Sequence, residues 1–204
     1  MALRIPPGRA GRTWLLERLE IAGRGADLLD RKRRALLREQ MRLRAEAEQA
    51  RHAWQQAQSE AQLWIGRASV LDGVGRLEVL ARHAHTHAVL ELSWSNLMGA
   101  RLPSAERLEL PDPPALSALG ASSAAVNAAR AHCEATRAAA RYALAERAYQ
   151  ELSAELARAT RRLRALQKRW IPQHEAALAQ LELALDESQR EQAARVRWAI
   201  RANP

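Results

Sequence analysis

The chain contains 204 residues, a single cysteine (Cys133) and a formal net charge of +9. One cysteine excludes an intrachain disulfide and a multi-cysteine metal site, and no apolar run reaches the ~18 residues that a membrane-spanning helix needs. The first residues, MALRIPPGRAGR, lack the apolar centre of a signal peptide, so we expect a soluble, cytoplasmic chain. The absence of Phe and the abundance of Ala, Leu, Glu and Arg are typical of long helices rather than of a compact globule.

The N-terminal segment, residues 9–66, is predicted to form one long helix. Pro6, Pro7 and Gly8 interrupt any helix before it, and no proline occurs from residue 9 to residue 102. Apolar residues then recur at alternating spacings of four and three, which is the pattern of a two-helix coiled coil. The predicted seam comprises Leu15, Leu19, Ala22, Ala26, Leu29, Leu36, Leu43, Ala47, Ala50, Trp54, Ala57, Ala61 and Trp64, with polar residues at Arg33 and Gln40.

The middle segment, residues 67–121, departs from this pattern. Alternating apolar residues in 87–94, HAVLELSW, predict a β-strand. Residues 101–110 predict a returning strand, and the proline in it restricts that strand to a sheet edge. We therefore expect a short helix followed by a β-hairpin in this segment. Residues 111–121 are expected to form a loop after the hairpin. The predicted hairpin residues of interest are Asn96, Met98, Gly99 and Pro103.

Residues 122–200 are predicted to form the second long helix. Its seam comprises Leu152, Leu156, Ala159, Leu163, Leu166, Trp170, Gln173 and Ala177, and it continues less regularly through Leu181, Leu185 and Ala193 to Trp198. Pro172 is expected to remove one backbone hydrogen bond and to bend the helix at that point.

Two apolar seams in one chain are covered most simply if the chain folds back on itself. This predicts a mainly α fold, a long antiparallel two-helix coiled coil with a small β insertion, and it places Trp14 beside Trp198. Residues 1–45 carry twelve Arg and Lys against five Asp and Glu, and residues 155–204 carry ten against six. The shared end would therefore be basic. Such an end can bind nucleic-acid phosphates, dock in an acidic protein cavity, or remain a solvated face.

No catalytic motif is found: the chain has neither a phosphate-binding Gly-rich loop nor a nucleophile elbow. We expect no catalytic residue, no cofactor and no metal. His83, His85 and His87 alternate as residues on one strand face do, which could suit a metal ion. No supporting ligand is evident nearby, so a polar strand face is the favoured interpretation. The six Trp could stack on nucleic-acid bases, but three of them fall in the predicted seams, which favours packing.

Three short sequence motifs occur one after another along the chain, and their order and spacing can be compared with those of known families. The first contains Pro7, Arg9, Leu15, Arg18, Leu19, Ala22, Gly25, Leu28, Leu29, Lys32, Arg33 and Leu36, and the second is NLMGARLP at Asn96–Pro103. The third contains Arg161, Arg162, Ala165, Leu166, Ile171, Pro172, Glu175, Glu187, Arg190, Glu191, Arg195 and Arg197. Together they resemble the D subunit of the V-type and archaeal-type rotary ATPases. Departures from the family pattern at Gly8, Ala10, Leu16, Arg34 and Arg164 indicate a divergent member.

The resemblance implies a non-catalytic component of the central stalk. Such a component transmits torque between a hexamer of A and B subunits, which holds the nucleotide sites, and a membrane rotor that moves protons or sodium ions during ATP synthesis or hydrolysis. The implied partners also include the small F subunit of the stalk and a C/d-type rotor adaptor, at a peripheral position without membrane insertion. The implied hexamer contacts are Pro7, Arg9, Trp14, Arg18, Arg190, Arg195 and Trp198.

Two other functions fit parts of the sequence. A basic coiled-coil protein that binds nucleic acid, or acts as a scaffold, would use its basic end to grip phosphates in a salt-dependent manner. A His-ligated metalloenzyme would hold stoichiometric metal through His83 and His87.

Overall fold

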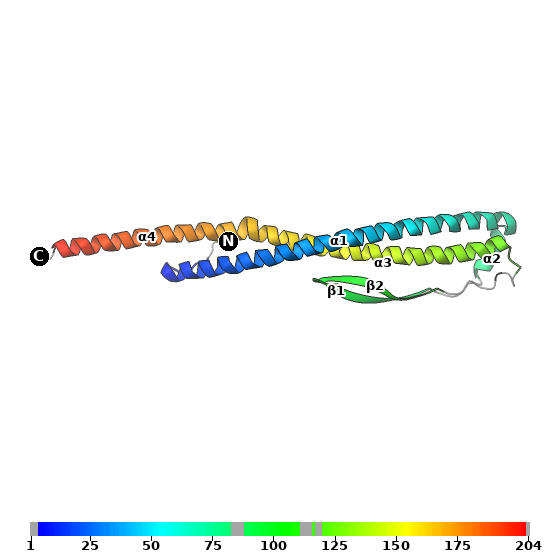
Figure 1. Cartoon of the computed structure of the whole chain (residues 1–204), viewed down its shortest axis with the longest axis horizontal. Helices are drawn as coiled ribbons and strands as arrows, with labels where there is room; N and C mark the ends of the chain where they lie inside the picture. The colour runs from blue at the N-terminus through cyan, green and yellow to red at the C-terminus, as the bar shows by residue number, and fades with distance from the viewer. Residues whose placement is uncertain (1–3, 83–87, 111–115, 117–119, 203–204) are drawn as a thin grey trace. The chain divides into compact units, whose positions relative to one another are not determined.

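The computed structural model describes residues 4–82, 88–110, 116 and 120–202. Its elements are α1 (Gly8–Asp72), α2 (Val74–Arg82), β1 (Val89–Leu97), β2 (Ala100–Glu109), α3 (Ser123–Ala165), the π-helical turn η1 (Leu166–Trp170) and α4 (Ile171–Ala202) (Figure 1). The predicted mainly α fold with a small β insertion is confirmed. His83, His85 and His87 lie outside the described residues.

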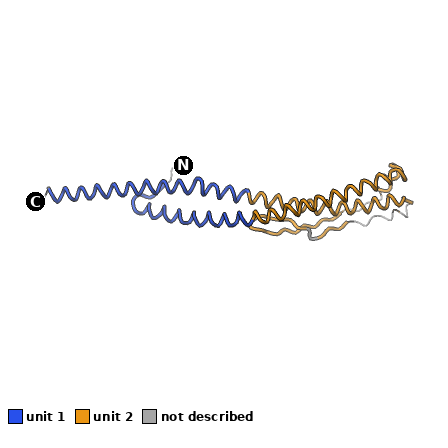
Figure 2. Tube along the Cα trace, turned by 45° about the horizontal axis from the view of Figure 1, so that its top comes forward, with its two compact units in different colours: residues 1–35, 157–204 blue, residues 36–156 orange. Residues whose placement is uncertain are grey.

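The chain divides into two compact units, which Figure 2 shows in different colours. Unit 1 contains residues 1–35 and 157–204, and unit 2 contains residues 36–156. Both long helices α1 and α3 contribute to each unit, so each unit combines an N-terminal and a C-terminal stretch of the sequence.

Unit 2 is built on antiparallel packing of α1 against α3. The side-chain amide of Gln40 donates a hydrogen bond to the Ser153 hydroxyl (2.9 Å), and the Trp54 ring stacks on Tyr142 with centroids 5.5 Å apart. Residue numbers rise on one helix as they fall on the other, which defines the antiparallel direction. Small side chains allow the close approach of the two helices. The buried alanines of this unit on α1 and α3 are Ala47, Ala61, Ala68, Ala124, Ala125, Ala128, Ala135 and Ala148.

Unit 1 is also built on antiparallel packing, in which the first part of α1 lies against η1 and α4. Arg12 forms an ion pair with Glu182 of α4 (2.8 Å), and a Cβ placed on Gly25 would lie 3.9 Å from the Leu166 side chain of η1. From the first pair to the second, residue numbers rise along α1 and fall along the partner segment, so the two segments are antiparallel. The buried apolar residues of this unit are Leu15, Ala22, Ala26, Ala159 and Leu163.

The end of α1 and the start of α3 are fixed to each other. The predicted boundary at residue 66 is too early, because α1 continues to Asp72 and the break comes at Gly73, whose φ of 77° is rarely open to other residues. The Asp72 carboxylate accepts hydrogen bonds from the backbone N–H and the hydroxyl of Ser122. The Ser122 hydroxyl oxygen in turn accepts the N–H of Ala125 (3.1 Å) and so caps α3.

A π turn at η1 changes the helix face that is buried. The N–H of Ile171 donates to the carbonyl of Leu166, five residues back, immediately before Pro172, which has no N–H to donate. The wider turn accommodates one extra residue and shifts the apolar stripe by one position. The predicted continuation of the seam through Gln173 is therefore wrong: that side chain is exposed, and His174 is buried instead, at 4% relative exposure.

The hairpin forms a two-stranded antiparallel sheet. Met98 and Gly99 connect its strands with φ angles of 50° and 90°, as in the two-residue turns whose twist matches that of a hairpin. The Asn96 side chain accepts the N–H of Gly99 (2.9 Å). Pro103 lies opposite Trp94 in the register, and β2 is an edge strand, where the missing N–H of a proline is tolerated.

We predict that Leu152→Ala lowers the free energy of unfolding by about 2–5 kcal/mol, because Leu152 is fully buried between the helices and its truncation leaves a cavity. Leu183→Ala is the matched control: Leu183 is 70% exposed, and the change should stay within about 0.5 kcal/mol. Denaturant unfolding followed by helical circular dichroism measures both. Equal effects of the two substitutions would contradict the packing described for unit 2.

Candidate partner interfaces

Within the described ranges, no group of three or more His, Cys, Asp or Glu residues could hold a metal ion. No helix of the same ranges has the length and apolar content needed to cross a membrane. Cys133 is half-buried and forms no disulfide. The candidate functional features are instead surfaces on which large apolar side chains remain exposed, because such surfaces commonly mark contacts with other proteins.

The first such surface is the α4 tail, which we define as residues 186–201. Every residue in it is exposed, so this part of the helix is not covered by the rest of the described chain. Its large apolar side chains are Val196, Trp198 and Ile200, and Trp198 is 76% exposed. Arg190, Arg195 and Arg197 share the tail with them. An isolated helix of this length is marginal in water, which favours a partner surface around it.

The start of α1 packs against α4 just before this tail. Arg9 and Arg12 line a polar groove of about 490 Å³ together with Glu182 and Asp186. The guanidinium of Arg18 lies 4.9 Å from the centre of the Trp14 ring, a cation–π distance. Pro7 and Arg9 are exposed and Trp14 is half-buried. The predicted contact residues at the two ends thus lie within unit 1.

Trp14 and Trp198 are not neighbours. Arg12 pairs with Glu182, and Trp198 follows Glu182 by sixteen residues, which corresponds to about 24 Å along a helix. The expectation that the two rings meet is wrong, because α4 continues past the residues that pack against the start of α1. Trp198 is therefore left without the intrachain neighbour that the simple folded-back scheme supplies.

A second surface lies where α1 turns into α2, in unit 2. We call it the α1–α2 corner and define it by Val70, Leu71, Val74 and Val79. All four side chains are exposed, and Val70 is 84% exposed. The corner is held by the bonds of Asp72 to Ser122 and by the Arg76 guanidinium, which donates to the carbonyl of Gly120 (2.6 Å). The corner is thus hydrogen-bonded to the segment just before α3, while its four apolar side chains face solvent.

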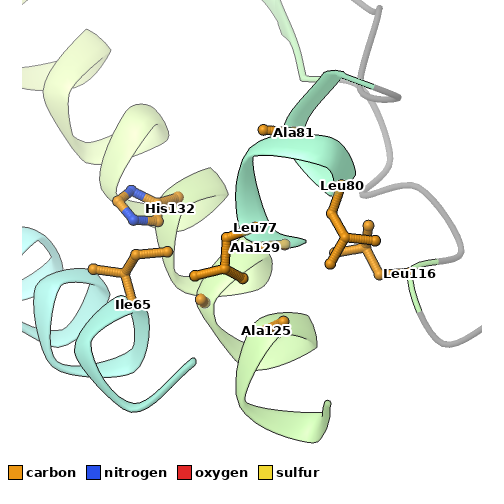
Figure 3. A pocket seen from close by; sticks show the side chains of 9 residues that line it. Ile65, Leu77, Leu80, Ala81, Leu116, Ala125, Ala129 and His132 are labelled. Carbon is orange, nitrogen blue, oxygen red and sulfur yellow. The ribbon is translucent and has the colours of Figure 1, made fainter. Parts of the chain in front are cut away.

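An apolar cavity of about 160 Å³ lies next to the corner (Figure 3). Its walls come from three helices and one loop residue: Ile65 of α1, Leu77 and Leu80 of α2, Leu116, and Ala125, Ala128 and His132 of α3. Figure 3 shows the labelled side chains gathered around it. The cavity is large enough for one aliphatic side chain and offers little polar surface for a charged ligand.

The hairpin supplies a third exposed apolar face. Leu90, Leu92 and Trp94 alternate along β1 and so share one face of the two-stranded sheet. All three are exposed, and Met98 in the turn is exposed as well. The guanidinium of Arg101 lies 5.5 Å from the centre of the Trp94 ring. Asn96 and Gly99 shape the turn, whereas Pro103 is buried.

The sequence departures Arg34 and Arg164 have different surroundings. Arg34 forms an ion pair with Asp30 (2.7 Å), and so does Arg33 (2.9 Å). Hydrogen bonding from Arg33, together with the charge of Arg34, lowers the pKa of Asp30 below its ordinary value, in spite of the opposing effect of desolvation. Arg164 is exposed on α3.

A sequence model of the family described as the D subunit of ATP synthase matches residues 13–201 of the chain. The V-type ATP synthase D subunit of Thermus thermophilus is 30% identical over 179 residues, which cover 88% of this chain and 80% of that protein. The A-type ATP synthase D subunit of Pyrococcus horikoshii is 31% identical over 192 residues, covering 93% and 90%. That of Haloarcula marismortui is 26% identical over 200 residues, covering 97% and 87%.

The chain belongs to the D-subunit family of ATP synthases. The match runs through both long helices and the hairpin, so the three surfaces are parts of a D subunit and not additions to it. Membership also associates the chain with ATP synthesis and ion transport in a multi-subunit complex.

The corner and its cavity are the features of this D subunit that sequence reasoning missed. The signal was present in residues 68–80, ASVLDGVGRLEVL, where apolar side chains are too dense for one helix face. The interpretation of Gly66 as the end of the helix concealed it.

We predict that Arg33→Gln/Arg34→Gln raises the pKa of Asp30 toward its ordinary value, because both cations that favour the carboxylate are removed. The folded-state pKa is depressed, so the interaction stabilises the fold above the unfolded-state pKa and is lost as the pH falls through the folded-state pKa. Carbon-13 NMR titration of the Asp30 carboxyl measures the shift. Arg44→Gln, which disrupts the separate ion pair with Glu48, should leave the Asp30 pKa unchanged; an equal shift in both variants would refute the assignment.

Proposed function

We propose that this chain belongs to the central stalk of a V/A-type rotary ATP synthase or ATPase and that it transmits torque without catalysing a reaction. The observation that carries the proposal is the exposed α4 tail in a chain that belongs to the D-subunit family. A helix that presents Trp198, Ile200 and several arginines to solvent is poorly suited to an isolated protein, and it is well suited to a cavity formed by other subunits.

The proposed contact with the A/B hexamer combines the α4 tail with the start of α1. Its residues are Pro7, Arg9, Trp14, Arg18, Arg190, Arg195 and Trp198. Exposed arginines attract an acidic cavity wall at long range, and the apolar side chains supply the contact energy once water is excluded. Trp and Arg are also the residue types that most often dominate interface energetics.

The α1–α2 corner and the hairpin are proposed to bind the other stalk components. Val70, Leu71, Val74 and Val79 offer an apolar seat for a C/d-type rotor adaptor, and the adjacent cavity can accept one of its side chains. The face formed by Leu90, Leu92 and Trp94 is available to the small F subunit of the stalk. The chain would then be peripheral to the membrane and cytoplasmic, held there by its partners.

Torque transmission requires helices that do not slip past one another. α1 is continuous over 65 residues, about 100 Å of helix, and it contributes to both units. The Gln40–Ser153 hydrogen bond and the Trp54–Tyr142 stack are specific pairs that fix the register between α1 and α3. An asymmetric shaft that contacts three catalytic interfaces differently favours different conformations in turn, and this coupling acts in both directions.

We predict that the chain co-purifies with co-expressed A and B subunits at one copy per hexamer. Deletion of residues 188–204 should abolish this association, because it removes Trp198, Ile200 and the arginines of the tail while uncovering no buried side chain. Size-exclusion chromatography with mass determination measures the stoichiometry. The purified chain alone should show no ATP hydrolysis.

Val70→Ser/Leu71→Ser is the reciprocal control. It changes exposed side chains at the corner and should leave the hexamer association intact while it weakens binding of the C/d-type adaptor. Failure of the intact chain to join the hexamer, combined with tight salt-dependent binding to DNA, would replace the stalk proposal by the nucleic-acid alternative.

A further inference from the structure

Unit 1 contains an open groove that none of the surfaces above includes. Its apolar lining comes from Leu29 of α1 with Ala165, Leu166 and Trp170, and its polar lining from Arg162, Arg169 and Gln173. Arg162 and Arg169 are both exposed, and we call them the rim arginines. The volume is about 420 Å³. Leu166, Arg169 and Trp170 all belong to the π turn η1, so the groove lies along this turn.

The charge around this groove has one sign along the C-terminal helices. Residues 156–174 contain no Asp or Glu, and they contain Arg158, Arg161, Arg162, Arg164, Lys168 and Arg169. Neither rim arginine has a carboxylate three or four residues away on its own helix, the spacing that forms ion pairs along a helix. On the facing helix, Asp30 is already bound to Arg33 and Arg34. The rim therefore carries cationic charge that an acidic partner can complement.

The apolar lining favours a protein segment over a nucleic acid as the occupant, because contact with Leu29, Ala165 and Leu166 stabilises an apolar side chain and not a phosphate backbone. The Trp170 ring is stacked on His174, with centroids 3.5 Å apart and an interplanar angle of 20°, so one ring face is covered and cannot stack on a base. His174 is held in place because its Nδ1 hydrogen-bonds to the Trp170 carbonyl (2.8 Å). What remains accessible is an apolar trough between two guanidinium groups, which fits an apolar side chain flanked by carboxylates.

We propose that this groove docks an acidic segment of a surrounding catalytic subunit. The segment places one apolar side chain between Leu29 and Trp170, and its carboxylates pair with Arg162 and Arg169. The inference rests on the stalk function proposed above and adds a specific contact to it, at a level separate from the α4 tail. Because ion pairs at a partly exposed rim are screened by salt, the contact makes assembly dependent on ionic strength.

The test compares Arg162→Glu/Arg169→Glu with the intact chain, using the A/B hexamer from the same source. Dissociation constants are measured by biolayer interferometry at low and high salt. The intact chain should bind more weakly as salt rises, and the variant should bind at least about 10-fold more weakly at low salt with a much smaller salt dependence. Arg130→Glu/Arg141→Glu is the matched control, since it makes the same change in net charge at exposed positions of α3 in unit 2, and it should leave both quantities unchanged.

Further measurements identify the occupant. A photo-crosslinking amino acid in place of the exposed groove residue Gln173 should capture a hexamer peptide with at least two Asp or Glu beside an apolar residue. Capture of a neutral or basic peptide overturns the proposal. The proposal is also overturned if the Arg162→Glu/Arg169→Glu variant folds, as judged by helical circular dichroism, and binds the hexamer as tightly as the intact chain does. A variant that loses binding to DNA but keeps its affinity for the hexamer would likewise overturn it.

These outcomes separate the groove from the stalk function. If the intact chain joins the hexamer and the groove variant joins it equally well, only the groove inference fails. If the intact chain does not bind the hexamer at all, the stalk function itself fails, and the groove inference fails with it.

Discussion

Contact between small apolar side chains on antiparallel helix segments is the interaction on which both units depend. The chain has no Phe, and its fully buried large side chains are leucines such as Leu15, Leu36 and Leu152. The remaining buried positions on the long helices are mostly alanine, which gains little from burial but allows the helices to come close. A narrow seam of this kind leaves most of each helix surface exposed, so the same helices that hold the fold together also carry the interfaces.

The sequence predicted the elements that depend on local chemistry. Pro6 to Gly8 mark the start of the first helix, and Asn96 with Gly99 marks the turn of the hairpin, because breakers and turns need specific residue types. The sequence did not show where the seam changes face at η1. Pro172 predicted a disturbance, but both a bend and a π turn accommodate the N–H that proline lacks. The hydrogen bond from the Ile171 N–H to the Leu166 carbonyl and the burial of His174 in place of Gln173 identify the π turn.

The sequence predicted which residue types form the candidate interfaces better than it predicted where those residues lie in the fold. The arginines and Trp198 near the chain ends indicated a contact region from charge alone, but the distance between Trp14 and Trp198 depended on how far α4 continues past the start of α1. The α1–α2 corner was hidden because Gly66 looked like a helix end, whereas Gly73 is the glycine with the positive φ. A glycine in a sequence shows that a break is allowed; packing determines whether it is used.

Pulsed electron spin resonance between paired labels tests the antiparallel packing most directly. In a Cys133→Ser background diluted with unlabelled protein, labels at positions 12 and 182 report on unit 1, and labels at positions 54 and 142 report on unit 2. Helices in contact have axes about 8–10 Å apart, so the account predicts short, narrow distance distributions for both pairs within a single chain. A long distance for either pair, or a short one that disappears on dilution, would contradict it.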